Sequence, residues 1–229
     1  VACECIVNNF SGPLGTPEST KAKLVTVFLK AHEEIKAAFR ALPGVVNDKG
    51  VPRYGIGGKP VRGGTTLTVV IVDVASGVII IANVGDSTAI VINGNDSKTL
   101  TVAHKPSNPE EYLRLRATPG ALIPVIDSKH IKRKSDCMSV FGDDGKLQVP
   151  GIEYGAFHVN ASLERGQYFV SRPGLDYVCI AMSRALGDFY AHSQGLTCMP
   201  SVSSHTIKHG DIVCAGSDGV WDVFTLERV

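Results

Sequence analysis

Three aspartates stand beside glycines at points where apolar runs of the sequence stop. They are Asp86 in "NVGDST", Asp188 in "SRALGDF" and Asp218 in "GSDGVWD". A carboxylate at the end of a buried strand is costly to desolvate unless a positive group pairs with it. Mg²⁺ and Mn²⁺ prefer carboxylate and water oxygens, and a metal-bound water becomes a nucleophile near neutral pH. Together the three stretches favour hydrolysis assisted by a divalent cation, whereas each one alone is typical of a simple turn.

The elements that must position these aspartates are strands. The runs 65–74, 78–84 and 87–92 are rich in β-branched residues and are separated by short turns. Short turns predict antiparallel neighbours, and therefore a meander of these three strands. Their central residues are apolar on both faces, which predicts a sheet covered on both sides. Two further strands are predicted over 177–183 and 211–217.

Helices are predicted mainly at the N-terminal end. Apolar residues recur at helical spacing over 17–42, after a Thr-Pro start that is typical of a helix cap. Shorter helices are predicted over 1–9 and 106–117. The glycine-rich stretch 44–64 fits neither phosphate-loop pattern, so we interpret it as a mobile connector.

We predict one α+β domain, in which a mostly antiparallel sheet system has helices on its outside. Its parts over 1–229 are a helical segment 1–43, a loop 44–64, a sheet core 65–105 and 177–224, and an irregular insertion 124–176 with short strands.

Composition excludes several classes of partner. The net charge is +1, without a basic or acidic tail, which disfavours nucleic acid and anionic membrane. The basic stretch 129–134 is interpreted as a solvated loop, and no apolar run approaches the length of a membrane span. The six cysteines form no C-x-x-C pair, and Cys3-Glu4-Cys5 has no matching pair downstream, so a zinc site is not expected there. Reduced cysteines favour an intracellular location, cytoplasmic or nuclear.

Taken in order, five stretches resemble motifs of the metal-dependent protein phosphatases of the PPM family, the type-2C Ser/Thr phosphatases. "ANVGDSTAIV" is similar to A-N-x-G-D-S-R-A-V-L, "LTVAHKP" to L-T-x-D-H-K-P, and "GSDGVWDVF" to A-S-D-G-L-W-D-V. "GGTTL" is similar to S-G-[ST]-T-A and "IAMSRALGD" to L-A-V-S-R-A-L-G-D. As an extension of the "LTVAHKP" match, "EEYLRL" resembles the E-x-x-R-I that follows that motif in the family. The five matches are spread over residues 63–224.

This resemblance implies an antiparallel β-sandwich flanked by helices in α-β-β-α layers, here incomplete at both ends. It also implies two Mg²⁺ or Mn²⁺ ions whose bridging water attacks phosphoserine or phosphothreonine in a phosphoprotein. Asp218 matches the family's metal-ligating aspartate on its strand. Asp86 and Asp222 match the ligands of a third, weaker metal position.

Other residues in these motifs are expected to support the site. Thr66, Gly85 and Gly219 lie beside the metal ligands by their motif positions. Arg184 and Asp188 are expected to pin a loop beside the sheet, as is Ser183, and His104 in the "HKP" turn is likewise expected to be structural.

The sequence also departs from the family pattern. The D-G-H-G-G stretch, the upstream Arg and Glu-Asp pair, and the downstream D-N motif are absent from these 229 residues. Thr88 stands where the family has Arg, and Ala103 where it has Asp. Of the main two-metal ligands only Asp218 is present. One carboxylate cannot hold two divalent cations against their hydration shells, so the isolated chain is predicted to be a poor or inactive phosphatase.

Three hypotheses remain open. The missing motifs belong to parts of the natural protein outside this sequence, or the protein is a pseudophosphatase that binds a partner without catalysis. The well-kept stretches 82–91 and 180–188 favour the first, whereas Thr88 and Ala103 favour the second. The third is a carbohydrate- or peptide-binding β-sandwich with chance motif overlap, which would show no response to divalent metals at Asp86 or Asp218. A truncated sandwich would also expose strand edges, which predicts self-association.

Overall fold

The structure is a computed structural model. It describes residues 1–10, 13–105, 108–118, 124–126, 155–159, 161–164, 167–171, 178–180, 182–192, 195–221 and 223–224. Asp222, the basic stretch 129–134 and much of the segment 124–176 lie outside the described residues.

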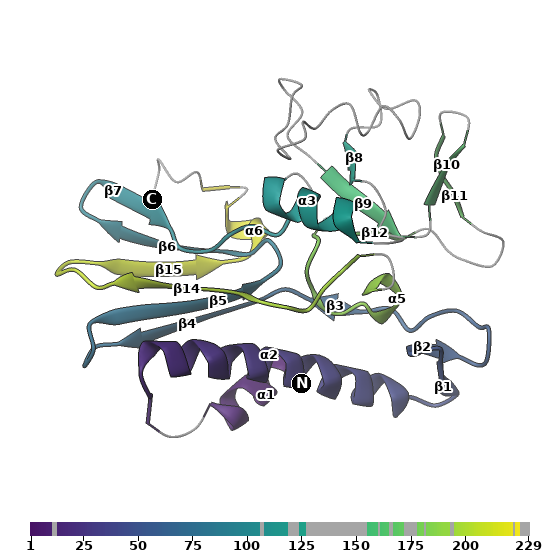
Figure 1. The fold of residues 1–229 in the computed structure, drawn as a ribbon, viewed down its shortest axis with the longest axis horizontal. Helices are drawn as coiled ribbons and strands as arrows, with labels where there is room; N and C mark the ends of the chain where they lie inside the picture. The colour runs from purple at the N-terminus through teal and green to yellow at the C-terminus, as the bar shows by residue number, and fades with distance from the viewer. Residues whose placement is uncertain are drawn as a thin grey trace.

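Two three-stranded antiparallel sheets form the centre of the fold (Figure 1). Their strands are β4 (Leu67–Asp73), β5 (Val78–Val84), β6 (Thr88–Asn93), β7 (Asp96–Thr99), β14 (Ser201–Thr206) and β15 (Ile212–Gly216). One sheet has the order β14–β5–β4 and the other the order β15–β6–β7. Ile79 and Ile81 of β5 pack with Ala89 and Val91 of β6 in one buried cluster. The inner faces of the two sheets therefore share a core, which confirms the predicted antiparallel sandwich.

The predicted meander is correct for β4 and β5 but wrong for β6. β4 and β5 pair along their whole length, whereas β6 pairs with β15 and β7 in the other sheet. The short connection 85–87 carries the chain from one sheet to the other, and Gly85 turns it with a φ of 104°. A short apolar–turn–apolar pattern is shared by hairpins and by such crossings, so local sequence does not separate them.

A helical layer covers the outer face of the β14–β5–β4 sheet. It contains α1 (Ala2–Asn9) and α2 (Pro17–Arg40), which lie side by side below this sheet in Figure 1. The Thr16 hydroxyl accepts a hydrogen bond from the Ser19 amide at 3.2 Å and so caps α2. Phe28 of α2 is fully buried in a cluster that includes the β5 side chains pointing away from the other sheet. β5 is thus apolar on both faces because each face is covered.

The prediction of a loop over 44–64 is wrong for its first half. β1 (Val45–Asp48) and β2 (Val51–Tyr54) form an antiparallel hairpin. Lys49 and Gly50, which close it, both have positive φ angles, of 49° and 85°. This is the backbone of a two-residue primed turn, for which Asn-Gly or Asp-Gly is the usual sequence signal. The hairpin was not predicted from the sequence because lysine, rather than Asn or Asp, occupies the first turn position.

Shorter elements complete the described fold. The helices are α3 (Pro109–Ala117), α5 (Phe189–His192) and α6 (Asp218–Trp221). β3 (Gly64–Thr65) pairs with β13 (Leu186–Gly187). The remaining strands are β8 (Pro124–Ile126), β9 (Gly155–Val159), β10 (Ala161–Glu164), β11 (Gln167–Ser171) and β12 (Val178–Ile180). β12–β9–β8 form an antiparallel sheet and β10–β11 a separate pair. Among the described helices, none combines the length and apolar character needed to cross a bilayer.

Candidate metal site at the end of the sandwich

Asp86 and Asp218 lie at the same end of the β15–β6–β7 sheet. The antiparallel ladder between β6 and β15 ends with Thr88 opposite Gly216. Asp86 lies two residues before Thr88, and Asp218 lies two residues after Gly216. Both aspartates therefore lie on the segments that leave this ladder at its Thr88–Gly216 end. Two carboxylates at one sheet end can contribute oxygen ligands to the same region.

Asp218 is exposed and begins α6. Its carboxylate accepts a hydrogen bond from the Gly219 amide at 2.9 Å. The Trp221 indole donates to the carbonyls of Thr88 at 3.1 Å and Gly216 at 3.0 Å, which ties α6 to both strands of the ladder. Trp221 therefore holds Asp218 in place, while most of the Asp218 carboxylate remains open to a ligand.

Asp86 is far less exposed. Its side chain is 8% exposed, and its carboxylate lies 3.8 Å from the Lys105 ammonium, whose side chain is 32% exposed. Lys105 belongs to the "HKP" stretch, so this ion pair joins two motifs. The pair is long and one partner is flexible, which makes its contribution to stability small. A cation that binds Asp86 must compete with Lys105.

Gly85 is required beside Asp86, whereas Gly219 is not required beside Asp218. A Cβ on Gly85 would lie 2.2 Å from Cγ2 of Thr66, and its φ of 104° is strained for other residues. The Thr66 hydroxyl lies 2.9 Å from the Ser87 hydroxyl, so Thr66 lies beside the turn that carries Asp86. A Cβ on Gly219 would meet only the Ser217 hydroxyl, at 3.6 Å.

His104 holds the Gly85 turn from behind. Its Nδ1 accepts a hydrogen bond from the Gly85 amide at 3.1 Å, and its own amide donates to the Gly85 carbonyl at 3.0 Å. Its Nε2 lies 2.7 Å from the Ser201 hydroxyl. Burial, with a smaller effect from Arg184, lowers the pKa of His104 to about 4, so the ring is neutral at pH 7. These contacts are those of a residue that holds backbone in place.

Known proteins resemble this chain in both sequence and fold. A family model described as "Protein phosphatase 2C" matches residues 21–229. The chain belongs to the protein phosphatase 2C family. Probable protein phosphatase 2C 61 of Arabidopsis thaliana is 48% identical over 60 residues, which are 26% of this chain and 17% of that protein. Probable protein phosphatase 2C 12 of Oryza sativa subsp. japonica is 30% identical over 131 residues, 57% of this chain and 24% of that protein.

Two solved structures share the fold of this chain. A serine-threonine phosphatase 2C from Toxoplasma gondii has a TM-score of 0.58 at 16% identity, covering 99% of this chain and 61% of that chain. A C. elegans sex determining protein has a TM-score of 0.56 at 18% identity, covering 98% and 40%. The chain thus spans less than two thirds of these relatives, and the likeness to them concerns the fold.

A second family motif is organised around a carboxylate that sequence reasoning did not single out. Glu111 of α3 has a side chain that is 2% exposed, and it pairs with Arg184 at 2.5 Å and Arg114 at 2.9 Å. The Ser183 hydroxyl also donates to it. Burial raises the pKa of Glu111, but hydrogen bonds from Arg184, Arg114 and Ser183 outweigh this effect and lower the pKa to about 2. The signal in the sequence was "EEYLRL", which resembles E-x-x-R-I of the protein phosphatase 2C family.

Asp188 lies at the β3–β13 junction. Its amide donates to the Gly63 carbonyl at 2.7 Å, and its carboxylate accepts a hydrogen bond from the Tyr190 hydroxyl at 3.1 Å. A Cβ on Gly64 would meet this carboxylate at 1.9 Å, so the two segments are in tight contact. Burial raises the pKa of Asp188. Asp188 is therefore packed against the backbone of the Gly63–Gly64 segment.

Two described carboxylates at this sheet end could take part in binding a hard cation. The protein phosphatase 2C family is generally metal-dependent, and these carboxylates belong to Asp218 and to Asp86, which is paired with Lys105. In the part of the chain that the structure describes, the side chains that meet as a group of three metal-type ligands are instead His32, His192 and Cys198.

Proposed function

We propose that the protein is a Mg²⁺- or Mn²⁺-dependent protein serine/threonine phosphatase whose metal site includes this end of the sandwich. In this proposal Asp218 is a main metal ligand, and Asp86 and Asp222 hold a weaker ion. The observation that supports it most is the β6–β15 register, which brings Asp86 and Asp218 to one sheet end. The family assignment supports phosphate-ester hydrolysis as the reaction class.

Asp218, Trp221 and Lys105 have different proposed roles at the metal site. When bound, divalent metal ions supply a nucleophilic water and neutralise the charge of the phosphoryl oxygens. In this proposal Asp218 binds a metal ion. The Trp221 indole fixes the end of β15, from which Asp218 follows. Lys105 neutralises Asp86 until a cation displaces it, so Asp86 is available without an unpaired buried charge.

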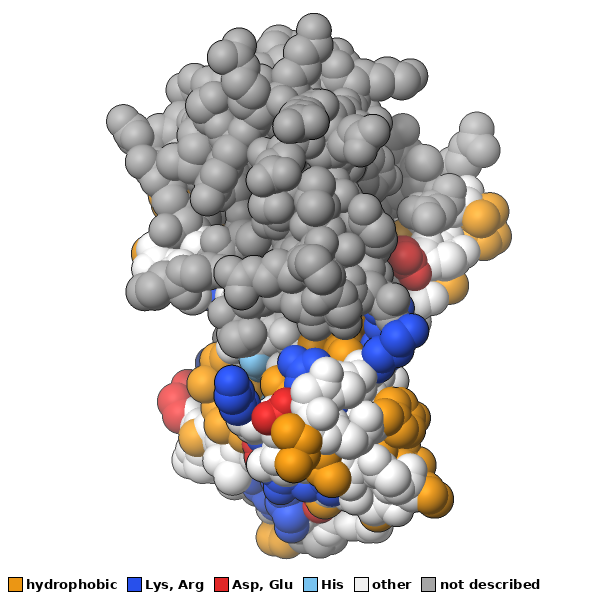
Figure 2. All heavy atoms as spheres, turned by 90° about the vertical axis from the view of Figure 1, so that its right-hand side faces the viewer, with side chains coloured by type: hydrophobic (Ala, Val, Ile, Leu, Met, Phe, Trp, Pro, Cys, Tyr) orange, Lys and Arg blue, Asp and Glu red, His pale blue; other side chains and the backbone are white. Residues whose placement is uncertain are grey.

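A phosphoprotein substrate agrees with the charge of one face of the molecule. Figure 2 views the right-hand side of Figure 1, where α2 ends and the β1–β2 hairpin lies, and its described part shows several Lys and Arg side chains among apolar and a few acidic ones. Arg40, Lys49, Lys59 and Arg62 are exposed in this region. A basic face attracts negatively charged segments, and added salt screens this attraction. We also propose an intracellular location, cytoplasmic or nuclear, because the cysteines are interpreted as reduced.

The ligand count limits the activity of the isolated chain. Asp86, Asp218 and Asp222 do not suffice to hold two hydrated divalent cations, so full activity would need ligands that this sequence does not contain. We propose that the 229-residue chain hydrolyses phosphothreonine peptides at close to the background rate. The second candidate is a pseudophosphatase that binds a partner, which is favoured by Thr88 and Ala103 in place of the family's Arg and Asp.

Mn²⁺ binding tests the site directly. The free Mn²⁺ electron paramagnetic resonance signal, measured during titration, should report weak binding of Mn²⁺ by the chain. Asp218→Asn should weaken that binding at least several-fold. Asp96→Asn is the matched control, since Asp96 is an exposed aspartate at the other end of the same sheet. Equal binding by both variants would contradict the site, and strong Mn²⁺-dependent turnover by the wild-type chain would contradict the ligand count.

Self-association is the remaining proposal about partners. β4 pairs with β5 on one side, and the other side of β4 is an edge within the described residues. Val72 and Val74 are both exposed beside this edge. Exposed edge strands pair with other chains. Sedimentation velocity at rising concentration should then show a dimer, and a monomer at every concentration would contradict this proposal.

A further inference from the structure

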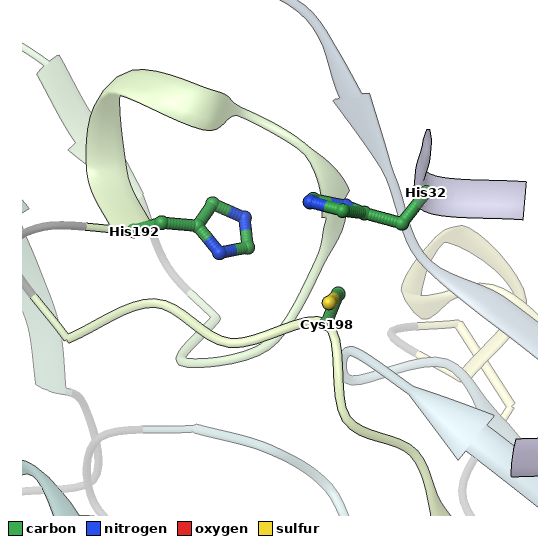
Figure 3. A group of neighbouring side chains, drawn as sticks. All are labelled: His32, His192 and Cys198. Atoms are coloured by element: carbon green, nitrogen blue, oxygen red, sulfur yellow. The ribbon is translucent and has the colours of Figure 1, made fainter. Parts of the chain in front are cut away.

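Three potential metal ligands from distant parts of the sequence meet in one place. His32 lies on α2, His192 ends α5, and Cys198 lies in the segment before β14. One ligand atom from each lies within 4.8 Å of the other two. Figure 3 shows the two rings and the thiol arranged around a common space, with a ring nitrogen of His32 directed towards His192. His32 is 7% exposed and the other two are half-buried.

The peptide groups of Gly187 orient both rings. The His192 Nε2–H donates to the Gly187 carbonyl at 2.9 Å, which leaves Nδ1 of His192 with its lone pair. A backbone carbonyl in this role is typical of the partner that orients a metal-bound histidine. The Gly187 amide donates to Nδ1 of His32 at 3.2 Å, which leaves Nε2 of His32 directed away from this contact.

The protonation states suit coordination by the two rings. Burial lowers the pKa of His32 to about 4 and also lowers the pKa of His192, so both rings are neutral at pH 7. Neutral imidazoles are the form that binds metals. Burial raises the pKa of the Cys198 thiol, which therefore keeps its proton until a cation displaces it. The Glu33 carboxylate raises the pKa of Cys198 and of His192, whereas the Lys36 ammonium lowers the pKa of both histidines, so one charge of each sign lies near the group.

We propose that His32, His192 and Cys198 bind a Zn²⁺ ion. One sulfur and two imidazole nitrogens match the preference of Zn²⁺, whereas Mg²⁺ and Mn²⁺ prefer oxygen. The site is therefore chemically distinct from the aspartates at the end of the sandwich. Binding forms one Zn–S and two Zn–N bonds and releases the thiol proton of Cys198 to solvent. The fourth position of the tetrahedron is taken by water.

Small movements complete the site. With Zn–N bonds of about 2.0–2.1 Å and a Zn–S bond of about 2.3 Å, tetrahedral ligand atoms lie about 3.3–3.6 Å apart. The present separations of up to 4.8 Å must therefore shorten by about 1 Å, which side-chain rotation supplies. Ligation through Nε2 of His32 also moves its proton to Nδ1, so the long hydrogen bond from the Gly187 amide is given up.

A bound ion would join α2 to the segment that contains β13 and α5. Gly187 contacts both rings, and Asp188, the next residue, is in tight contact with Gly64. The ion would thus hold the S-R-A-L-G-D stretch against the helical layer. Its expected role is to stabilise this junction, independently of catalysis at Asp218.

Co²⁺ titration of the purified, reduced protein in excess Mg²⁺ tests the proposal. Mg²⁺ occupies oxygen sites, so a near-ultraviolet thiolate-to-cobalt band would report Cys198 ligation whether or not the protein is a phosphatase. We expect the band to saturate at one equivalent and to disappear when Zn²⁺ is added. Cys198→Ser should abolish the band, and Cys214→Ser, a half-buried cysteine on β15, should leave it unchanged.

Two further measurements keep the test decisive. His192→Gln should lower Co²⁺ affinity at least tenfold, and circular dichroism checks that each variant is folded. Zn²⁺ should raise the thermal midpoint of the wild type and not that of Cys198→Ser, because a ligand stabilises only the state that binds it. The proposal is overturned by the absence of a saturable band in the wild type, or by a band that persists in Cys198→Ser.

Discussion

Glu111 and Asp218 are both motif carboxylates, yet their surroundings are opposite. Glu111 is buried and bound by two arginines and a serine, whereas Asp218 is exposed with one backbone amide as its described partner. A carboxylate whose lone pairs are filled by the protein holds structure together. A carboxylate with open lone pairs at a strand end is available to a ligand. The comparison separates, within one family pattern, the residues that build the fold from those that are proposed to bind metal.

The largest expected effect comes from breaking the Glu111 cluster. Glu111→Ala leaves Arg184 and Arg114 largely buried without their counter-charge, and removing one partner of a buried pair costs about 3–5 kcal/mol. Urea unfolding followed by circular dichroism measures this loss in the free energy of unfolding. Glu110→Ala, an exposed neighbour on α3, is the control and should change stability by less than about 0.5 kcal/mol. A loss below about 1 kcal/mol in Glu111→Ala would show that this carboxylate does not organise the region.

The next effect is a loss of stability in acid. His32 and His104 have folded pKa values of about 4, below the usual value of 6.5. The unfolded state therefore binds their protons first, so their contribution is fully present above pH 6.5 and is lost as pH falls towards 4. Each contributes up to about 3 kcal/mol from a shift of this size.

Glu111 acts in a different pH window from the histidines. Its folded pKa is about 2 against a usual 4.5, so its contribution is lost as pH falls from about 4.5 towards 2. Urea midpoints measured from pH 7 to pH 3 should fall first in the histidine window. Glu111→Gln should keep that first fall and lose the later one. A wild-type midpoint that stays flat between pH 6.5 and 4.5 would contradict the buried neutral histidines.

A smaller effect distinguishes the two glycines beside the aspartates. Gly85→Ala places a Cβ against Thr66 in a positive-φ backbone, and we expect a loss of about 1–3 kcal/mol. Gly219→Ala has room for its Cβ and should change the free energy of unfolding by less than about 0.5 kcal/mol. Thermal unfolding of the two variants gives the comparison. Equal losses would mean that the Gly85 turn is not tightly packed.

Local patterns predicted most elements, but not how they are joined. The helix at 17–40 and the strands β4, β5 and β6 follow from spacing and β-branched content, which are properties of neighbouring residues. The crossing at 85–87 and the hairpin at Lys49-Gly50 were missed because their turns carry no distinctive sequence signal.

The sites depend on contacts between distant residues. Glu111 meets Arg184 across 73 positions, and His32 meets the Gly187 amide across 155. Neither pairing is visible in the sequence around its members. The aspartates could be predicted from the sequence because each has its motif directly around it. That Asp86 and Asp218 lie at one end of a sheet is visible only from the β6–β15 register.

The smallest effect on stability is expected at Asp218. Asp218→Asn removes no described partner other than the Gly219 amide, so its free energy of unfolding should match the wild type within about 0.5 kcal/mol. Chemical denaturation measures this, in contrast with the large loss in Glu111→Ala. A loss above 2 kcal/mol would place Asp218 with Glu111 among the residues that build the fold.

Paramagnetic broadening by Mn²⁺ tests the proposed metal site most directly. In amide NMR spectra, substoichiometric Mn²⁺ should broaden the signals of residues 85–87 and 217–219 and leave those of 94–97, at the other end of the sheet, sharp. Asp218→Asn should remove the broadening. Broadening centred on 94–97, or spectra unchanged by Mn²⁺, would contradict the metal site at the end that carries Asp86 and Asp218.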